Sequence, residues 1–196
     1  MIKKALICVS LAAVMLTGCA GDYVPNNPVF GEGEEYTLGE LSFRTEHQVT
    51  EYSAYELWVA DGDYIIKMTY SPLQHNETDV YEDVEHIIQS RETLWDTLVQ
   101  SFPEATRSTE TQRRSARIDG YDADAIMYYV QTDMPQGAEY YDFQQFFESA
   151  KITTDKYSYT ITYIGYTEED TKLDMQYLKE RAQNIYYGIE INPNAG

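Results

Sequence analysis

Apolar and polar residues alternate along two runs of the chain that flank the turn at residues 61–63. The apolar members of these runs are Tyr55, Leu57, Val59, Tyr64, Ile66, Met68 and Tyr70. Because successive side chains of a strand point to opposite faces of a sheet, this pattern predicts a hairpin with one buried face. A further strand is predicted before it, over residues 38–43.

Longer strands are predicted in the second half of the chain. Residues 111–118 and 121–130 flank the dipeptide Asp119-Gly120, and residues 157–163 alternate tyrosine and isoleucine with serine and threonine. The intervening segment, residues 139–152, fits a helix as well as a strand. We favour the strand because turn-like sequences lie on both sides of it.

Two segments have apolar residues at three- and four-residue steps, which is typical of amphipathic helices. The first covers about residues 79–101, with Asp79 and Glu82 as a capping box, and it includes Trp95. The second is predicted to be capped by Thr167 and Asp170 and to extend to about residue 189. The order of elements predicts an α+β domain, in which two amphipathic helices cover an antiparallel sheet.

The N-terminus carries a targeting signal. Lys3 and Lys4 precede an apolar stretch, residues 5–16, that would form a helix of only about 18 Å. This is too short to cross a hydrocarbon core of about 30 Å, so the stretch is interpreted as part of a signal peptide. Residues 16–19, Leu-Thr-Gly-Cys, resemble the lipobox of bacterial lipoprotein precursors. An ordinary secretory signal with a chance Gly-Cys pair is the alternative.

The lipobox resemblance implies a domain organisation. Residues 1–18 would be removed, and Cys19 would receive a diacylglyceryl group that anchors the protein to the extracytoplasmic face of a bacterial cell membrane. Residues 19–35 are predicted to be the lipidated N-terminus and a flexible tether, since they are rich in Gly, Pro, Asn and acidic residues. A single domain over residues 36–191 and a tail over residues 192–196 would follow.

Composition limits the partners and the kinds of site that the protein can have. The 196 residues include 33 Asp and Glu against 14 Lys and Arg, a net charge of −19, so nucleic acid is excluded as a partner. The other cysteine, Cys8, lies in the segment that would be removed. The mature domain would therefore have no thiol for a disulfide, for catalysis or for zinc.

The predicted domain resembles the PsbP-like family, which includes extrinsic photosystem proteins and bacterial lipoproteins of the DcrB type. The resemblance is carried by residues 120–123, which open a strand, by the strand at 157–163, and by a last helix that reaches Ile185. It implies a PsbP-like αβα sandwich over about residues 38–191. It also implies no shared catalytic residues, because members of the family act mostly as binding or assembly modules.

Local motifs predict no cofactor or metal. Glu82 and His86 would share a helix face, but two ligands do not make a metal site, and an acidic first helical turn explains the same residues. The acidic residues around the turn at 119–124 have the wrong spacing for a calcium loop, which favours a hairpin with outward-pointing acids. The nucleophile and phosphate-loop motifs of common enzymes are absent.

Four of the seven arginines lie within eleven residues: Arg107, Arg113, Arg114 and Arg117. They could bind an acidic ligand, but pairing with acidic residues across the sheet is the favoured interpretation. The 19 tyrosines suit half-buried sheet faces and also recognition surfaces. The candidate binding face is assigned to Tyr128, Tyr141 and Tyr166.

These features predict a non-enzymatic, membrane-tethered binding or accessory module of the cell envelope, whose partner is a protein or another envelope component. The alternative is an envelope hydrolase that uses a pair of carboxylates. Such a site would show two carboxyl groups about 5–10 Å apart, with raised pKa values, in a cleft.

Overall fold

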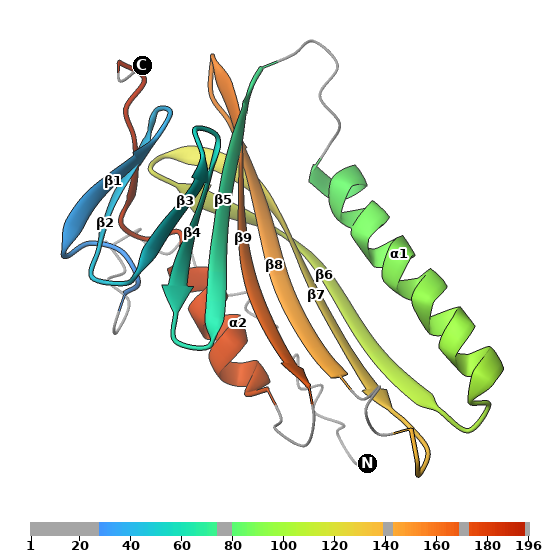
Figure 1. Cartoon of the computed structure of the whole chain (residues 1–196). Coiled ribbons are helices and arrows are strands. Elements are labelled where there is room, and N and C mark those ends of the chain that lie inside the picture. Colours follow the sequence, from blue (N-terminus) through green and yellow to red (C-terminus); the bar gives the residue numbers. More distant parts are fainter. Residues whose placement is uncertain (1–27, 74–79, 139–142, 169–172, 195–196) are drawn as a thin grey trace, which may run out of the picture.

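The computed structural model describes residues 28–73, 80–138, 143–168 and 173–194 (Figure 1). Its largest element is a seven-stranded sheet with the strand order β3-β4-β5-β9-β8-β7-β6, in which every neighbouring pair is antiparallel. The strands are β3 (Val49–Ser53), β4 (Glu56–Asp61), β5 (Tyr64–Pro72), β6 (Thr106–Ile118), β7 (Tyr121–Asp133), β8 (Phe143–Thr153) and β9 (Tyr157–Glu168). The strand favoured within residues 139–152 is thus confirmed as β8.

A second, three-stranded sheet has the order β1-β2-β10, with β1 (Glu34–Leu38), β2 (Leu41–Thr45) and β10 (Ile189–Ile191). The prediction of one strand over residues 38–43 was wrong, because the chain turns at Gly39 and Glu40. Gly39 has a φ of 65°, and a Cβ there would lie 2.7 Å from the hydroxyl of Tyr159. Glycine therefore lets this turn approach the large sheet closely.

The first predicted helix is confirmed as α1 (Val80–Ser101), whereas α2 (Met175–Asn184) begins later than predicted. Thr167 is not its cap but part of β9, where it pairs with Gln144 of β8. The cap is Asp174, whose side chain accepts a hydrogen bond from the Tyr177 backbone N–H at 3.0 Å. Within the described ranges, neither helix is both long and apolar enough to span a membrane.

The two faces of the large sheet are covered by different elements. On one face, the three-stranded sheet and α2 enclose the main core, where Phe43 and Leu178 belong to the same cluster as Ile161. On the other face, α1 packs against β7 and β8, and Ile88 contacts a cluster that includes Phe147. The prediction that two helices cover the sheet is therefore only partly correct. The small sheet covers part of one face together with α2, and α1 lies mainly over two strands of the other face.

The last residues of the segment predicted as a tether, residues 28–35, follow a fixed path in the structure. Val29 and Phe30 are buried in the main core, and the backbone N–H of Gly31 donates to the carbonyl of Arg44 at 2.8 Å. Strand β1 then begins at Glu34. Residues 28–35 are therefore packed against the domain, since burying two large apolar side chains favours a fixed path. Residues 1–27, including Cys19, lie outside the described residues.

Candidate binding groove

A surface groove lies between the end of β6 and the segment that joins α2 to β10. It consists of two adjoining cavities of about 680 and 280 Å³ that share Gly31, Gly188 and Glu190. One wall of the larger cavity contains Arg114, Ala116, Arg117 and Asp119. The other wall contains six residues from the end of α2 to β10, which are Gln183, Tyr186, Tyr187, Gly188, Ile189 and Glu190. We call this feature the strand-edge groove, and its larger cavity is within the usual size of ligand sites.

Both walls of the strand-edge groove include an edge strand of a sheet. Strand β6 is the last strand of the large sheet, and β10 is the last strand of the small one. The N–H of Asn192 donates to the carbonyl of Glu40 on the β2 side at 2.8 Å, whereas the N–H of Ile191 donates to the Asp119 carboxylate at 2.7 Å. Because alternate residues direct their amides to opposite sides, Asp119 occupies part of the free edge of β10.

Beneath the groove, Arg114 is held by a buried carboxylate. Glu148 of β8 is 2% exposed, forms an ion pair with Arg114, and accepts a hydrogen bond from the Tyr186 hydroxyl at 2.9 Å. The Arg114 guanidinium also lies 5.8 Å from the centre of the Tyr186 ring. Burial, reinforced by the charge of Glu148, raises the pKa of Tyr186 well above its usual value, so this hydroxyl remains a donor.

The rim of the groove is exposed and carries charges of both signs. Arg117 donates from its Nε to the carbonyl of Gly120 at 3.2 Å, and its side chain is exposed. Tyr187 is 36% exposed, and Glu190 is a second exposed residue of the same wall. An arrangement of aromatic, cationic and anionic side chains suits recognition of a polar partner. By itself it does not supply the pair of an acid and a base that acid–base catalysis uses.

Of the three tyrosines proposed from the sequence as a binding face, the structure describes only the side chain of Tyr128, and this side chain is buried. Tyr128 is only 1% exposed, and its hydroxyl lies 3.5 Å from a carboxylate oxygen of Glu92 on α1. Its side chain is on the sheet face that α1 covers, so its assignment to an exposed binding face was wrong. Tyr166 is in β9 opposite Gln145, but its side chain is outside the description, and Tyr141 is outside the described residues altogether.

Tyrosine is nonetheless exposed elsewhere, at Tyr52, Tyr55, Tyr177 and Tyr187. Of these four, Tyr187 lines the groove. Sequence reasoning missed it because it follows a short helix instead of a strand. The pair Tyr186-Tyr187 before Gly188 was the available signal, since Gly188 has a φ of 79° and turns the chain into β10.

The arginine cluster is divided between structural and exposed positions. Arg107 forms an ion pair with Glu92 of α1 and lies 5.3 Å from the Trp95 ring, and Arg114 pairs with Glu148 across the sheet. The predicted pairing across the sheet is therefore confirmed for Arg114. Arg113 and Arg117 are exposed on β6.

The other candidate ligand groups are not assembled into a site. His86 is exposed on α1, the side chain of Glu82 is outside the description, and Asp122 and Asp124 point outward from β7 as expected of a hairpin. Among the described residues, no three side chains of the kinds that bind metals are grouped together.

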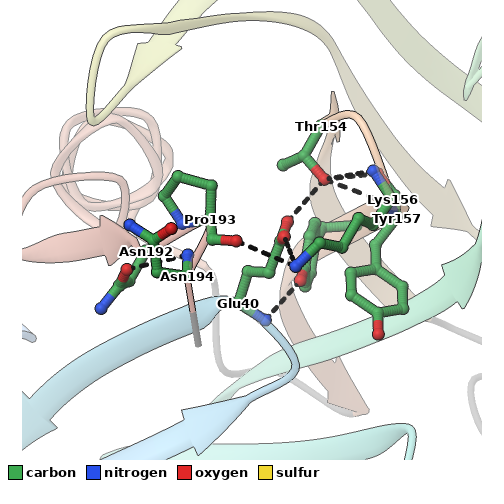
Figure 2. Close-up of polar contacts among 8 residues, drawn as sticks. Glu40, Thr154, Lys156, Tyr157, Asn192, Pro193 and Asn194 are labelled. Carbon is green, nitrogen blue, oxygen red and sulfur yellow. Dashed lines mark hydrogen bonds and ion pairs between the residues drawn. The ribbon is translucent and has the colours of Figure 1, made fainter. Parts of the chain in front are cut away.

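A second buried carboxylate joins the small sheet to the large one (Figure 2). Glu40 is 1% exposed. Its carboxylate accepts a hydrogen bond from the Thr154 hydroxyl at 2.7 Å and forms an ion pair with Lys156 at 3.1 Å. The backbone N–H of Glu40 donates to the Tyr159 hydroxyl at 2.7 Å. Burial raises the pKa of Tyr159 to about 12. Each carboxylate oxygen of Glu40 thus has a partner from the turn between β8 and β9, which indicates a structural role for the cluster.

A third buried carboxylate, Asp61, binds Arg181 of α2 through two hydrogen bonds of 2.7 and 2.8 Å and accepts another from Tyr163 at 3.0 Å. Burial by itself would raise the pKa of Asp61, but the hydrogen bonds and charge of Arg181, together with Tyr163, lower it. A hydrolase site would need a carboxyl group with a raised pKa, and Asp61 shows the opposite.

Comparisons with known proteins give a distant structural similarity. No family model and no curated protein sequence matches the chain. Among solved structures, the solution structure of cyanobacterial PsbP (CyanoP) from Synechocystis sp. PCC 6803 overlaps with a TM-score of 0.46 and 12% identity, over 90% of this chain and 98% of that one.

Proposed function

We propose that the protein is a lipid-anchored, non-enzymatic binding or accessory module of the bacterial cell envelope, which engages its partner through the strand-edge groove. The anchor in this proposal is a diacylglyceryl group on Cys19, inferred from the lipobox. The chain would then be held at the extracytoplasmic face of the membrane, with the domain beginning near residue 28.

The observation that carries the proposal is the composition of the groove. Its two cavities join along Gly31, Gly188 and Glu190, and its rim combines Tyr187 with the exposed Arg117. Tyrosine and arginine are the residues that most often supply binding energy in protein interfaces. The Glu148 ion pair below holds Arg114 in place, so the groove would be largely formed before a partner binds.

The proposal is tested by placing a photo-crosslinking amino acid at Tyr187 in the native envelope. The control position is Leu94, which is 46% exposed on α1 and outside the groove. We expect a discrete crosslinked species from position 187 and none of that size from position 94. Equal labelling from both positions, or none from either, would contradict a partner in the groove.

The hydrolase alternative has no comparable support. The described carboxylates that are buried, Glu40, Asp61 and Glu148, each have a cationic partner within the fold. Incubation of the purified protein with envelope glycans, followed by assay for new reducing ends, distinguishes the alternatives. Release of new ends that is lost on removal of a carboxylate would favour the hydrolase.

A further inference from the structure

We infer that the strand-edge groove binds a neutral glycan segment, with a sugar ring packed on Tyr187 and sugar hydroxyls bonded to Gln183 and Glu190. This inference rests on the proposed function, because it names the chemical class of partner that the groove would receive. Its basis is a concave site that combines an exposed aromatic ring, unused polar side chains and balanced charge.

The charges that line the groove balance one another, although the whole chain has a net charge of −19. The two cavities are lined by three cations and three anions, which are Arg44, Arg114, Arg117, Glu35, Asp119 and Glu190. A ligand with a high charge of either sign would meet like charges in such a site, and like charges brought together disfavour binding. A neutral ligand avoids this cost.

Five of these six charges already have partners within the fold. The contacts are Arg44 with Glu35, Arg114 with Glu148, the Arg117 Nε with the Gly120 carbonyl, and the Asp119 carboxylate with the Ile191 N–H. Arg117 also stands opposite Asp122 in the register of β6 with β7. The lining charges are thus mostly used by the fold itself, and a ligand does not have to neutralise them.

Two exposed polar side chains of the groove are available to a ligand. Gln183 and Glu190 make no side-chain hydrogen bond or ion pair with the described part of the chain. Glu190 lines both cavities, so it lies where they join. A carboxylate only accepts hydrogen bonds, whereas a glutamine amide both donates and accepts. Together they match neighbouring hydroxyl groups, each of which is both a donor and an acceptor.

Tyr187 supplies an apolar surface beside these polar groups. Its side chain is 36% exposed and lines the larger cavity. The face of an aromatic ring carries partial negative charge, so it attracts the weakly positive C–H groups on one face of a sugar ring. An aromatic ring next to free donors and acceptors is therefore suited to a ligand that has both C–H faces and hydroxyl edges.

The wall that carries these three side chains is fixed by its own contacts. The hydroxyl of the buried Tyr186 donates to Glu148 at 2.9 Å, and a Cβ at Gly188 would lie only 2.6 Å from the Phe30 carbonyl oxygen. Ile189 is buried and pairs with β2. Because the backbone on both sides of Tyr187 is held in place, little conformational freedom is lost when a ligand binds.

A peptide bound as an added strand of β10 fits the groove less well. Strand addition uses the free backbone amides of an edge strand. The Ile191 N–H on the free edge of β10 is already bound to the Asp119 carboxylate, and β10 has only three residues. The groove therefore offers side chains and not a backbone ladder to its ligand.

The test uses the full chain in mild detergent and three neutral tetrasaccharides, which are chitotetraose, cellotetraose and maltotetraose. Isothermal titration calorimetry measures binding, and we expect at least one of them to bind with a dissociation constant in the millimolar range or below. Because the ligand is uncharged, this constant should change less than about twofold between 0.01 and 1 M salt, over which the Debye length falls from about 30 to 3 Å.

Matched variants assign the binding to the groove. Tyr187→Ala should weaken binding at least about tenfold, whereas Tyr187→Phe keeps the ring and should retain most of it. Gln183→Ala and Glu190→Ala should each weaken binding several-fold. The control is Tyr55→Ala, which removes a tyrosine that is 57% exposed outside the groove and should have no effect. Urea melts of the variants should be unchanged, since all four positions are exposed.

Three results would overturn the inference. They are no binding of any tetrasaccharide at millimolar concentration, binding that weakens more than about tenfold with salt, and an equal loss in Tyr55→Ala and Tyr187→Ala. Chitosan tetraose, which has amines in place of the acetamido groups of chitotetraose, tests whether Glu190 selects a cation. Tighter binding of this cation than of every neutral sugar, lost in Glu190→Gln, would also overturn the neutral ligand.

The outcome is separable from the proposed function. Crosslinking of position 187 to a protein, without binding of any tetrasaccharide, would leave the groove as a binding site and remove only the glycan. Binding of a tetrasaccharide that is lost in Tyr187→Ala, without any crosslinked species in the envelope, would remove the proposed envelope partner and leave the groove as a sugar site.

Discussion

Substitution of Arg181 tests the buried ion pair that joins α2 to the large sheet. Arg181 and Asp61 have side chains that are 6% and 5% exposed, and they are joined by hydrogen bonds of 2.7 and 2.8 Å. Arg181→Met keeps most of the side-chain volume but leaves the Asp61 carboxylate buried without its cation. Loss of one partner of a buried pair typically costs about 3–5 kcal/mol, so we expect a loss of that order in the free energy of unfolding at pH 7.

The dependence on pH gives the reasoning a second, independent check. In the wild type, Arg181 and Tyr163 lower the pKa of Asp61, so the stability it contributes is present above its unfolded pKa of about 3.9 and is lost as the pH falls through the lower folded value. In Arg181→Met, burial without the cation should raise the folded pKa above that reference. Asp61 would then be protonated on acidification, and the stability difference from wild type should narrow between pH 7 and about 4.5.

Urea unfolding of the full chain in mild detergent, followed by circular dichroism, measures both effects. The control is Lys179→Met, which removes an exposed ion pair with Glu110 from the same helix and should cost less than about 1 kcal/mol. Adding Asp61→Asn to Arg181→Met should recover part of the loss. A loss no larger than that of Lys179→Met, or one independent of pH, would refute the reasoning.

Three further predictions concern the anchor, α1 and one tight turn. Cys19→Ala should abolish incorporation of labelled fatty acid, and full labelling of the variant would exclude the lipoprotein assignment. Trp95 is 9% exposed, so Trp95→Ala should lower the free energy of unfolding by about 3 kcal/mol in urea melts, and a loss below about 1 kcal/mol would contradict its packing role. Gly188→Ala should destabilise the domain more than Gly62→Ala in the same melts. Both glycines have positive φ, but only the Cβ at position 188 would meet backbone, 2.6 Å from the Phe30 carbonyl oxygen, and equal losses would contradict this contact.

Strand periodicity was the most informative sequence signal. Leu57 and Val59 in β4 and Met68 in β5 are almost fully buried, as alternation predicted for a sheet with one face in the core. The signal is local, because the alternation within a strand indicates which of its own residues are buried and not which strand it pairs with. The pairing of β5 with β9 joins segments about a hundred residues apart, as in the register Ile66↔Tyr163. No local pattern specifies such a partner, which depends on how both segments share the core.

The start of α2 illustrates competition between two local signals. Thr167 with Asp170 has the spacing of a capping box, and Asp174 is an equally acceptable cap. The ladder between β8 and β9 continues through Thr167, whose backbone is therefore occupied in the sheet. Asp174 is the acceptable cap that follows the end of this ladder. Tertiary pairing thus decides between caps of similar intrinsic strength.

The strand-edge groove could not be predicted from any one segment. It exists because the last strand of the large sheet approaches the last strand of the small sheet, where the N–H of Ile191 donates to the Asp119 carboxylate. The arginines of β6 were visible in the sequence. Arg114 is paired and Arg117 is exposed because the buried Glu148, two strands away from β6, binds Arg114.

The misassignment of Tyr128 has a physical reason that the sequence did contain. Residues 125–128 of β7 are all buried, because α1 covers one face of this strand while the main core covers the other. A strand buried on both faces appears as a continuous apolar run, and residues 125–130, Ala-Ile-Met-Tyr-Tyr-Val, form such a run. Exposed tyrosines are therefore expected where the chain leaves a covered strand or helix. Tyr187, which follows α2 and precedes the turn at Gly188, meets that condition. The proposed binding site is therefore at the edge of the sheet and not at its centre.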